Sequence, residues 1–163
     1  MKQSDGSPAA GASPRAGAAP GPDRDEEAKT CPSALCEEDA LLLGVVAPDG
    51  TVAYVRPPTR VSAEFVGRAR ALGHPERRFR FASRCVEAGC PQWTGRGCGV
   101  VDVAIGTAPP EQEQPALPAC VIRHSCRWYA QRGAAACAVC PLVVADTGGT
   151  LTYQSARMGP DSG

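Results

Sequence analysis

Residues 117–141 read LPACVIRHSCRWYAQRGAAACAVCP and carry four of the nine cysteines of the chain. These four thiols are Cys120, Cys126, Cys137 and Cys140, spaced C-x5-C-x10-C-x2-C and followed directly by a proline. A stretch this rich in cysteine either pairs its thiols in disulfides or gives them to a metal. The choice between these two states decides how the chain is held together.

Five further thiols lie upstream, as a C-x4-C pair and a C-x4-C-x7-C group. They are Cys31, Cys36, Cys85, Cys90 and Cys98. Nine thiols allow two four-thiolate sites with one spare cysteine, so all nine are candidate metal ligands and cofactor-binding residues. The stretch 117–141 is the obvious first site, and the upstream thiols form the pool for a second. Ligands exchanged between the two sites are a further alternative.

The compartment in which the chain works decides between disulfides and metal. An odd number of thiols cannot all pair within one chain. No apolar segment follows Lys2 to make a secretory signal, and no stretch reaches the ~20 apolar residues of a transmembrane helix. We therefore expect a cytoplasmic protein, whose thiols a reducing environment keeps free for a metal.

Iron–sulfur clusters fit the cysteine spacing better than zinc does. A [4Fe–4S] cluster needs four thiolates, and the turn from Cys137 to Cys140 would supply two of them. Structural zinc sites mostly use two C-x2-4-C knuckles, which the pairs Cys31/Cys36, Cys85/Cys90 and Cys137/Cys140 could provide, but the x5, x7 and x10 spacings fit zinc poorly. We expect one or two clusters, of the [4Fe–4S] type, with zinc as the alternative cofactor.

Two resemblances accompany this pattern. The C-x2-C-P ending at Pro141 resembles a ligand turn of bacterial ferredoxins, although their full C-x2-C-x2-C-x3-C-P run is not present. The wider pattern L-P-x-C-x-I-R-x-x-C-R-W … A-C-x-x-C-P resembles that of uncharacterised small bacterial cysteine-rich proteins, over about residues 31–146. This second resemblance implies a shared cysteine framework and no particular activity.

The composition divides the chain into three parts. Residues 1–30 are dominated by Ala, Gly, Pro, Ser and charged residues, and we expect a disordered tail there and another at 148–163. The part between them, 31–147, is then a cysteine-rich metal-binding domain. Aromatic residues make up 5% of the chain, so its apolar core is thin and a metal would have to staple it. The expected fold is a small, irregular, metal-stapled α+β domain with a β-hairpin, two or three short helices and cysteine-rich loops.

Local patterns locate several of these elements. An apolar run, a Pro-Asp-Gly turn and an alternating segment predict a β-hairpin over residues 41–55. Pro57-Pro58 are expected to break the chain. A helix capped by Ser62 should follow and should end at Gly73. The alternating residues 78–81 predict a short strand with two aromatics on one face.

The cysteine-rich stretch itself predicts a helix over residues 121–132 that ends at Gly133. Ile122, Cys126 and Tyr129 recur at i, i+4 and i+7, so they would share the inner face of that helix. Residues 99–105 fit a strand or a short helix equally well.

No P-loop, dinucleotide fingerprint, nucleophile elbow or H-E-x-x-H motif is present, so we do not expect the chain to be an enzyme by itself. The preferred function is electron transfer or redox sensing with a protein redox or regulatory partner. The alternatives are a zinc-stapled interaction module that docks through its arginine-rich residues 60–84, and a cysteine-based enzyme or maturation factor. The formal net charge is zero, which gives no field that favours nucleic acid or an anionic membrane. No small-molecule substrate is indicated.

Overall fold

The computed structural model describes residues 28–108, 116–145 and 152–153. Its elements are β1 (Thr30–Ala34), β2 (Leu41–Val46), β3 (Val52–Arg60), α1 (Ala63–Ala71), α2 (Pro75–Arg78), β4 (Phe79–Arg84), η1 (Glu87–Gly89), α3 (Gly99–Thr107), η2 (Arg123–Ser125), α4 (Arg127–Arg132), α5 (Ala134–Val139), η3 (Cys140–Leu142), β5 (Val143–Val144) and β6 (Thr152–Tyr153). The expected tails lie mostly outside the described residues, and β6 lies within the expected tail 148–163. The fold is a small α+β fold, as expected. No helix in the described part of the chain is long and apolar enough to cross a membrane.

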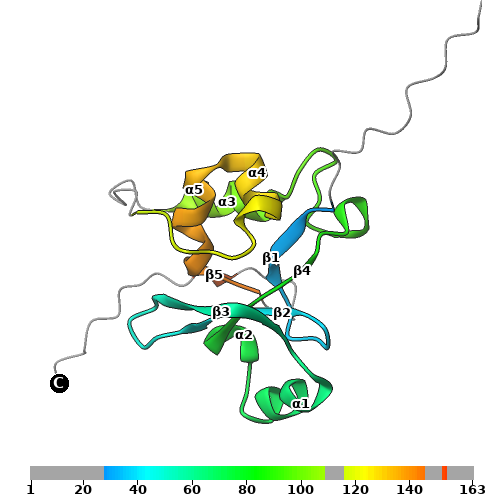
Figure 1. Cartoon of the computed structure of the whole chain (residues 1–163). Helices are drawn as coiled ribbons and strands as arrows, with labels where there is room; N and C mark the ends of the chain where they lie inside the picture. The colour runs from blue at the N-terminus through cyan, green and yellow to red at the C-terminus, as the bar shows by residue number, and fades with distance from the viewer. Residues whose placement is uncertain (1–27, 109–115, 146–151, 154–163) are drawn as a thin grey trace, which may run out of the picture.

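A four-stranded antiparallel sheet in the order β1-β4-β2-β3 forms the centre of the fold (Figure 1). The chain first makes the β2–β3 hairpin, which confirms the hairpin predicted from the Pro-Asp-Gly turn. It then returns through α1 and α2 to add β4 on the other side of β2. Strand β1 pairs with the far edge of β4, with Cys31 opposite Ser83.

The prolines at 57 and 58 do not break the chain, and that prediction was wrong. Strand β3 continues through them to Arg60. Leu42 pairs with Thr59 and Gly44 pairs with Tyr54, so residues 55–58 form an irregularity opposite a single residue of β2. Proline is tolerated there because β3 is an edge strand and the irregular segment needs no ladder hydrogen bonds.

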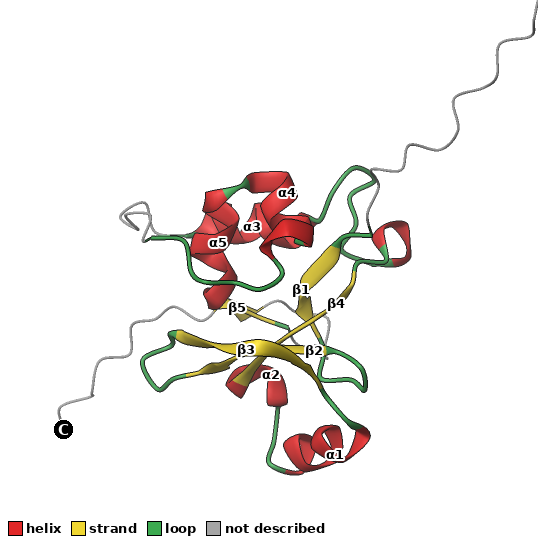
Figure 2. Ribbon diagram, viewed as in Figure 1, coloured by secondary structure: helices red, strands yellow, loops and turns green. Residues whose placement is uncertain are grey.

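Helices cover the two faces of the sheet separately (Figures 1 and 2). On one face, Leu43 and Ala82 pack with buried residues of α3, α4 and α5, and Trp128 is the largest fully buried side chain of this core. On the other face, Phe81 packs with Phe65 and Phe79 beside α1 and α2. Successive strand residues point to opposite faces, so one sheet serves two cores.

The helix after the hairpin forms as predicted. Ser62 is its N-cap and accepts a 3.2 Å hydrogen bond from the backbone N–H of Phe65. Gly73 follows its end with φ of 101°, a left-handed conformation that suits glycine. Residues 99–105, which fitted a strand or a helix, lie in the helix α3.

The single helix predicted over residues 121–132 is wrong. Two elements replace it, the 3₁₀ turn η2 and the helix α4, and Cys126 stands between them in an extended conformation. Cys126 also makes an isolated parallel bridge with Thr30 of β1. This tertiary contact overrides the helical periodicity, although Cys126 still points inward and is only 8% exposed. Gly133 ends α4 with φ of 59°, as predicted.

Candidate metal centre

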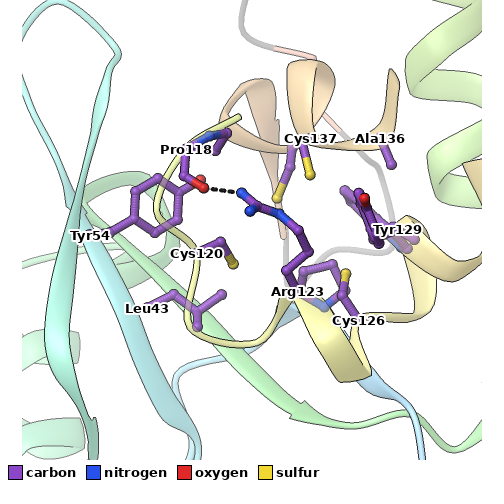
Figure 3. A pocket seen from close by; sticks show the side chains of 12 residues that line it. Leu43, Tyr54, Pro118, Cys120, Arg123, Cys126, Tyr129, Ala136 and Cys137 are labelled. Atoms are coloured by element: carbon purple, nitrogen blue, oxygen red, sulfur yellow. Dashed lines mark hydrogen bonds between the residues drawn. The ribbon is translucent and has the colours of Figure 1, made fainter. Parts of the chain in front are cut away.

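The four thiols of the cysteine-rich stretch line one cavity, drawn in Figure 3. We call Cys120, Cys126, Cys137 and Cys140 the C-terminal quartet. Cys120 lies in the loop before η2, Cys126 lies between η2 and α4, Cys137 lies on α5, and Cys140 begins η3. The cavity contains about 390 Å³ of atom-free space, including space open to solvent. The structure thus brings together the four residues that the sequence placed in the first site.

The rest of the cavity wall is largely apolar and comes from both layers of the fold. Leu43 of β2 and Tyr54 of β3 contribute the sheet side, and Trp128 and Ala136 contribute the helical side. A low-polarity wall of this kind limits the access of water to a metal site and influences its reduction potential.

Two arginines lie beside the quartet and carry unsatisfied hydrogen-bond donors. Arg80 is 8% exposed and donates to three backbone carbonyls, including that of Pro141 at 2.9 Å. Arg123 lines the cavity, donates to the carbonyl of Pro118, and lies among the thiols in Figure 3. The buried Nε–H of each has no hydrogen-bond partner among the described residues. Buried donors without partners call for an explanation, and an anionic group in the cavity would supply one.

The thiols of the quartet influence one another electrostatically. Burial raises the pKa of Cys140, and the neighbouring thiols of the other three members raise it further. Burial is also the main reason why the pKa values of Cys120 and Cys126 are raised. The raised pKa values of Cys120, Cys126 and Cys140 favour their neutral form in the absence of a counter-charge, and metal binding would release their protons.

Backbone N–H groups partly oppose this rise. Those of Ile122 and Arg123 lower the pKa of Cys120, and those of Tyr129 and Trp128 lower the pKa of Cys126. Backbone N–H groups directed at sulfur favour the thiolate form of a cysteine. In iron–sulfur clusters, hydrogen bonds to the sulfurs help to set the reduction potential.

Four of the five upstream thiols lie on the β1–β4 pair, at the end of β4, or in the loop that follows it. Burial is the main reason why the pKa of Cys31 is raised to about 12, and the thiols of Cys98, Cys85 and Cys90 raise it against an opposing hydrogen bond from Ser33. We call Cys31, Cys85, Cys90 and Cys98 the N-terminal quartet. Its members come from β1, from the end of β4 and from the loop that leads to α3.

Cys36 is not part of either quartet. It is fully buried in the core on the opposite face of the sheet, with Val61, Ala69 and Phe81. Its backbone N–H donates a 2.9 Å hydrogen bond to Glu76 and its carbonyl accepts one from Arg70. Among the described residues, no other cysteine belongs to this core cluster. The structure therefore separates Cys36 from the other eight candidate ligands.

Sequence reasoning missed three residues of the site. It placed Arg80 in an exposed basic segment, whereas the structure buries that arginine beside Cys140. Arg123 and Trp128 also went unnoticed as parts of a cavity wall. The one available signal was the alternation in residues 78–81, which sends Arg80 to the face opposite Phe79 and Phe81.

Among the described residues, no three His, Cys, Asp or Glu side chains lie close enough to hold one metal ion. The C-terminal quartet surrounds a space instead. No protein-family model, curated protein or solved structure matches this chain.

Proposed function

We propose that this chain is an iron–sulfur protein that carries electrons or senses redox state, and that the C-terminal quartet holds a [4Fe–4S] cluster. The observation that carries this proposal is the arrangement of the four thiols around one apolar cavity. A cluster with four irons and four sulfides lies between its thiolates, so its ligands must surround a space. Zinc would draw the same four sulfurs to within about 3.8 Å of one another, as tetrahedral bonds of ≈ 2.3 Å require.

The charges around the cavity support the same assignment. A cluster with four thiolate ligands is anionic, and the cationic Arg80 and Arg123 both lie beside the quartet with a donor to spare. Such neighbours stabilise the bound anion and raise its reduction potential. The cluster would supply one-electron chemistry, and the partner would be a protein that gives or accepts one electron.

The test is the iron and sulfide content of the full-length protein, purified without oxygen. We expect a brown protein with broad visible absorbance. Cys120→Ser and Cys137→Ser should each lower the iron and sulfide content, because a serine hydroxyl stays protonated and binds iron poorly. Cys36→Ser is the matched control and should keep all its iron. A colourless wild-type protein that contains zinc, or no metal, would contradict the proposal.

A further inference from the structure

We propose that the N-terminal quartet, Cys31, Cys85, Cys90 and Cys98, holds a second iron–sulfur cluster, and that the indole of Trp128 joins it to the first. This inference rests on the proposed function for the chemical nature of the cofactor. It goes further in assigning eight cysteines to two sites and leaving Cys36 out of both.

The sheet brings the first two ligands of this site together. Cys31 of β1 lies opposite Ser83 of β4, and Cys85 is two residues beyond Ser83. The backbone N–H of Cys85 donates a 2.8 Å hydrogen bond to the carbonyl of Lys29, which continues the pairing past the end of both strands. Both thiols are therefore fixed at the same end of the β1–β4 pair.

The loop after β4 supplies the other two ligands. Its fold is held by backbone hydrogen bonds from Trp93 to Cys90 at 3.0 Å and from Gly99 to Gln92 at 2.8 Å. The backbone of Cys98 is fixed on both sides by Gln131, whose amide accepts from its N–H at 2.9 Å and donates to its carbonyl at 3.0 Å. The loop is thus a defined structure that places the sulfur of Cys98 beside the indole of Trp128.

A partly buried cation also lies against this loop. The guanidinium of Arg127 is 5.2 Å from the ring centre of Trp93 and forms a salt bridge with Glu87. Its Nε–H is buried and has no hydrogen-bond partner among the described residues. The surroundings of the N-terminal quartet therefore repeat those of the C-terminal quartet, where Arg80 and Arg123 each have a spare buried donor.

Two contacts connect the quartets. Trp128 lines the cavity of the C-terminal quartet, and its indole N–H donates to the sulfur of Cys98 at 3.3 Å. Thr30, next to Cys31, forms a bridge with Cys126 and a 2.9 Å hydroxyl contact with Ser125. The two centres are neighbours as a result. Each proposed cluster would take one electron from a one-electron donor, so the fully reduced chain would hold two additional electrons.

The first test counts iron in full-length variants prepared without oxygen. Cys90→Ser and Cys85→Ser should each halve the iron of the wild type, and Cys137→Ser should remove the other half. A Cys90→Ser/Cys137→Ser double variant should contain almost none. Cys36→Ala is the control and should match the wild type. Circular dichroism of each variant identifies any that fail to fold. Cys85 and Cys90 lie in different segments, so if one of these two variants does not fold, the other still tests the N-terminal quartet.

The outcomes separate this inference from the proposed function. If Cys90→Ser and Cys85→Ser keep all their iron and Cys137→Ser loses all of it, the first cluster stands and the second is refuted. If every single variant loses all its iron, one cluster with shared ligands replaces both assignments. If the wild type holds zinc that each single variant halves, the two quartets stand and the iron–sulfur function fails.

The second test concerns Trp128. After full reduction with dithionite, electron paramagnetic resonance should show two interacting spins in the wild type. Trp128→Phe removes the N–H donor to Cys98 and should lower the reduction potential of one centre at unchanged iron content, because a hydrogen bond to sulfur favours the more negative reduced state. Equal potentials in the wild type and Trp128→Phe would refute the role of Trp128.

Discussion

The guanidinium of Arg80 donates a 2.9 Å hydrogen bond from Nη2 to the carbonyl oxygen of Pro141, the residue that directly follows Cys140. The same side chain donates from Nη1 to the carbonyls of Glu76 and Phe79. Arg80 belongs to β4, so one buried cation ties the central sheet to the residue that follows the last cysteine of the C-terminal quartet.

Replacing Arg80 should therefore destabilise the protein. Arg80→Met leaves three buried or partly buried carbonyls without this donor, and we expect the free energy of unfolding to fall by about 2–3 kcal/mol. Urea unfolding measures the change. Arg84→Met is the control on the same strand. Because the side chain of Arg84 is exposed, this substitution should change the free energy of unfolding by less than about 0.5 kcal/mol. Equal effects of the two substitutions would show that the hydrogen bonds of Arg80 do not stabilise the folded protein.

Removal of the metal should loosen one half of the fold more than the other. Four of the eight quartet cysteines, Cys98, Cys120, Cys126 and Cys140, lie in or against the core that contains Trp128 and Val101, whereas Phe65, Phe79 and Phe81 pack on the opposite face. Ligation supplies folding free energy directly, so the melting temperature should fall by at least about 5 °C. Hydrogen exchange should rise first in α4 and α5. An unchanged melt of the metal-free protein would contradict the prediction.

Two glycines should respond in opposite ways to alanine. A Cβ at Gly44 would lie 2.7 Å from the backbone oxygen of Ala53, which cannot move without disturbing the hairpin. Gly44→Ala should therefore lower the free energy of unfolding by about 1–3 kcal/mol. Gly67 lies on the exposed side of α1 with nothing within 4 Å of its Cβ position. Gly67→Ala should raise the free energy of unfolding by about 0.5–1 kcal/mol, because glycine is a poor helix former. Chemical denaturation of both variants checks the contrast.

The hairpin turn should contribute to the dependence of stability on pH. The Asp49 carboxylate accepts hydrogen bonds from the hydroxyl of Thr51 at 2.7 Å and from its backbone N–H at 2.9 Å. These bonds lower the pKa of Asp49 in the folded state. The stability that they supply is present at neutral pH and is lost as the pH falls through that lowered pKa.

Nuclear magnetic resonance titration of the Asp49 carboxyl tests this prediction. Thr51→Val removes the hydroxyl and should move the pKa of Asp49 back toward its ordinary value. Thr51→Ser keeps a hydroxyl and should leave the pKa low. The same pKa in Thr51→Val and the wild type would assign the shift to another cause.

The sequence predicted those features that depend on neighbouring residues. The hairpin, the Ser62 cap and the grouping of the four thiols within 117–141 all follow from local patterns. The break at Cys126 did not, because it depends on a bridge to Thr30, a residue far away in the chain. Which cysteines make up the N-terminal quartet could not be predicted either, because it also depends on contacts between residues far apart in the chain. A register irregularity in β1 between Cys31 and Ala34 breaks the alternation of faces, so the face that Cys36 occupies could not be derived from its spacing.

The pairing of β1 with β4 also makes the two quartets differ in the length of chain that each must close. The C-terminal quartet lies within 21 consecutive residues, from 120 to 140, whereas 54 positions separate Cys31 from Cys85. Closing the longer loop costs more chain entropy, and it requires the sheet between the two cysteines to form first. We therefore expect a complete, refolding chain to load the proposed centre at the C-terminal quartet first and to close the N-terminal quartet last, so that loading of the second proposed centre would report that the whole domain has folded.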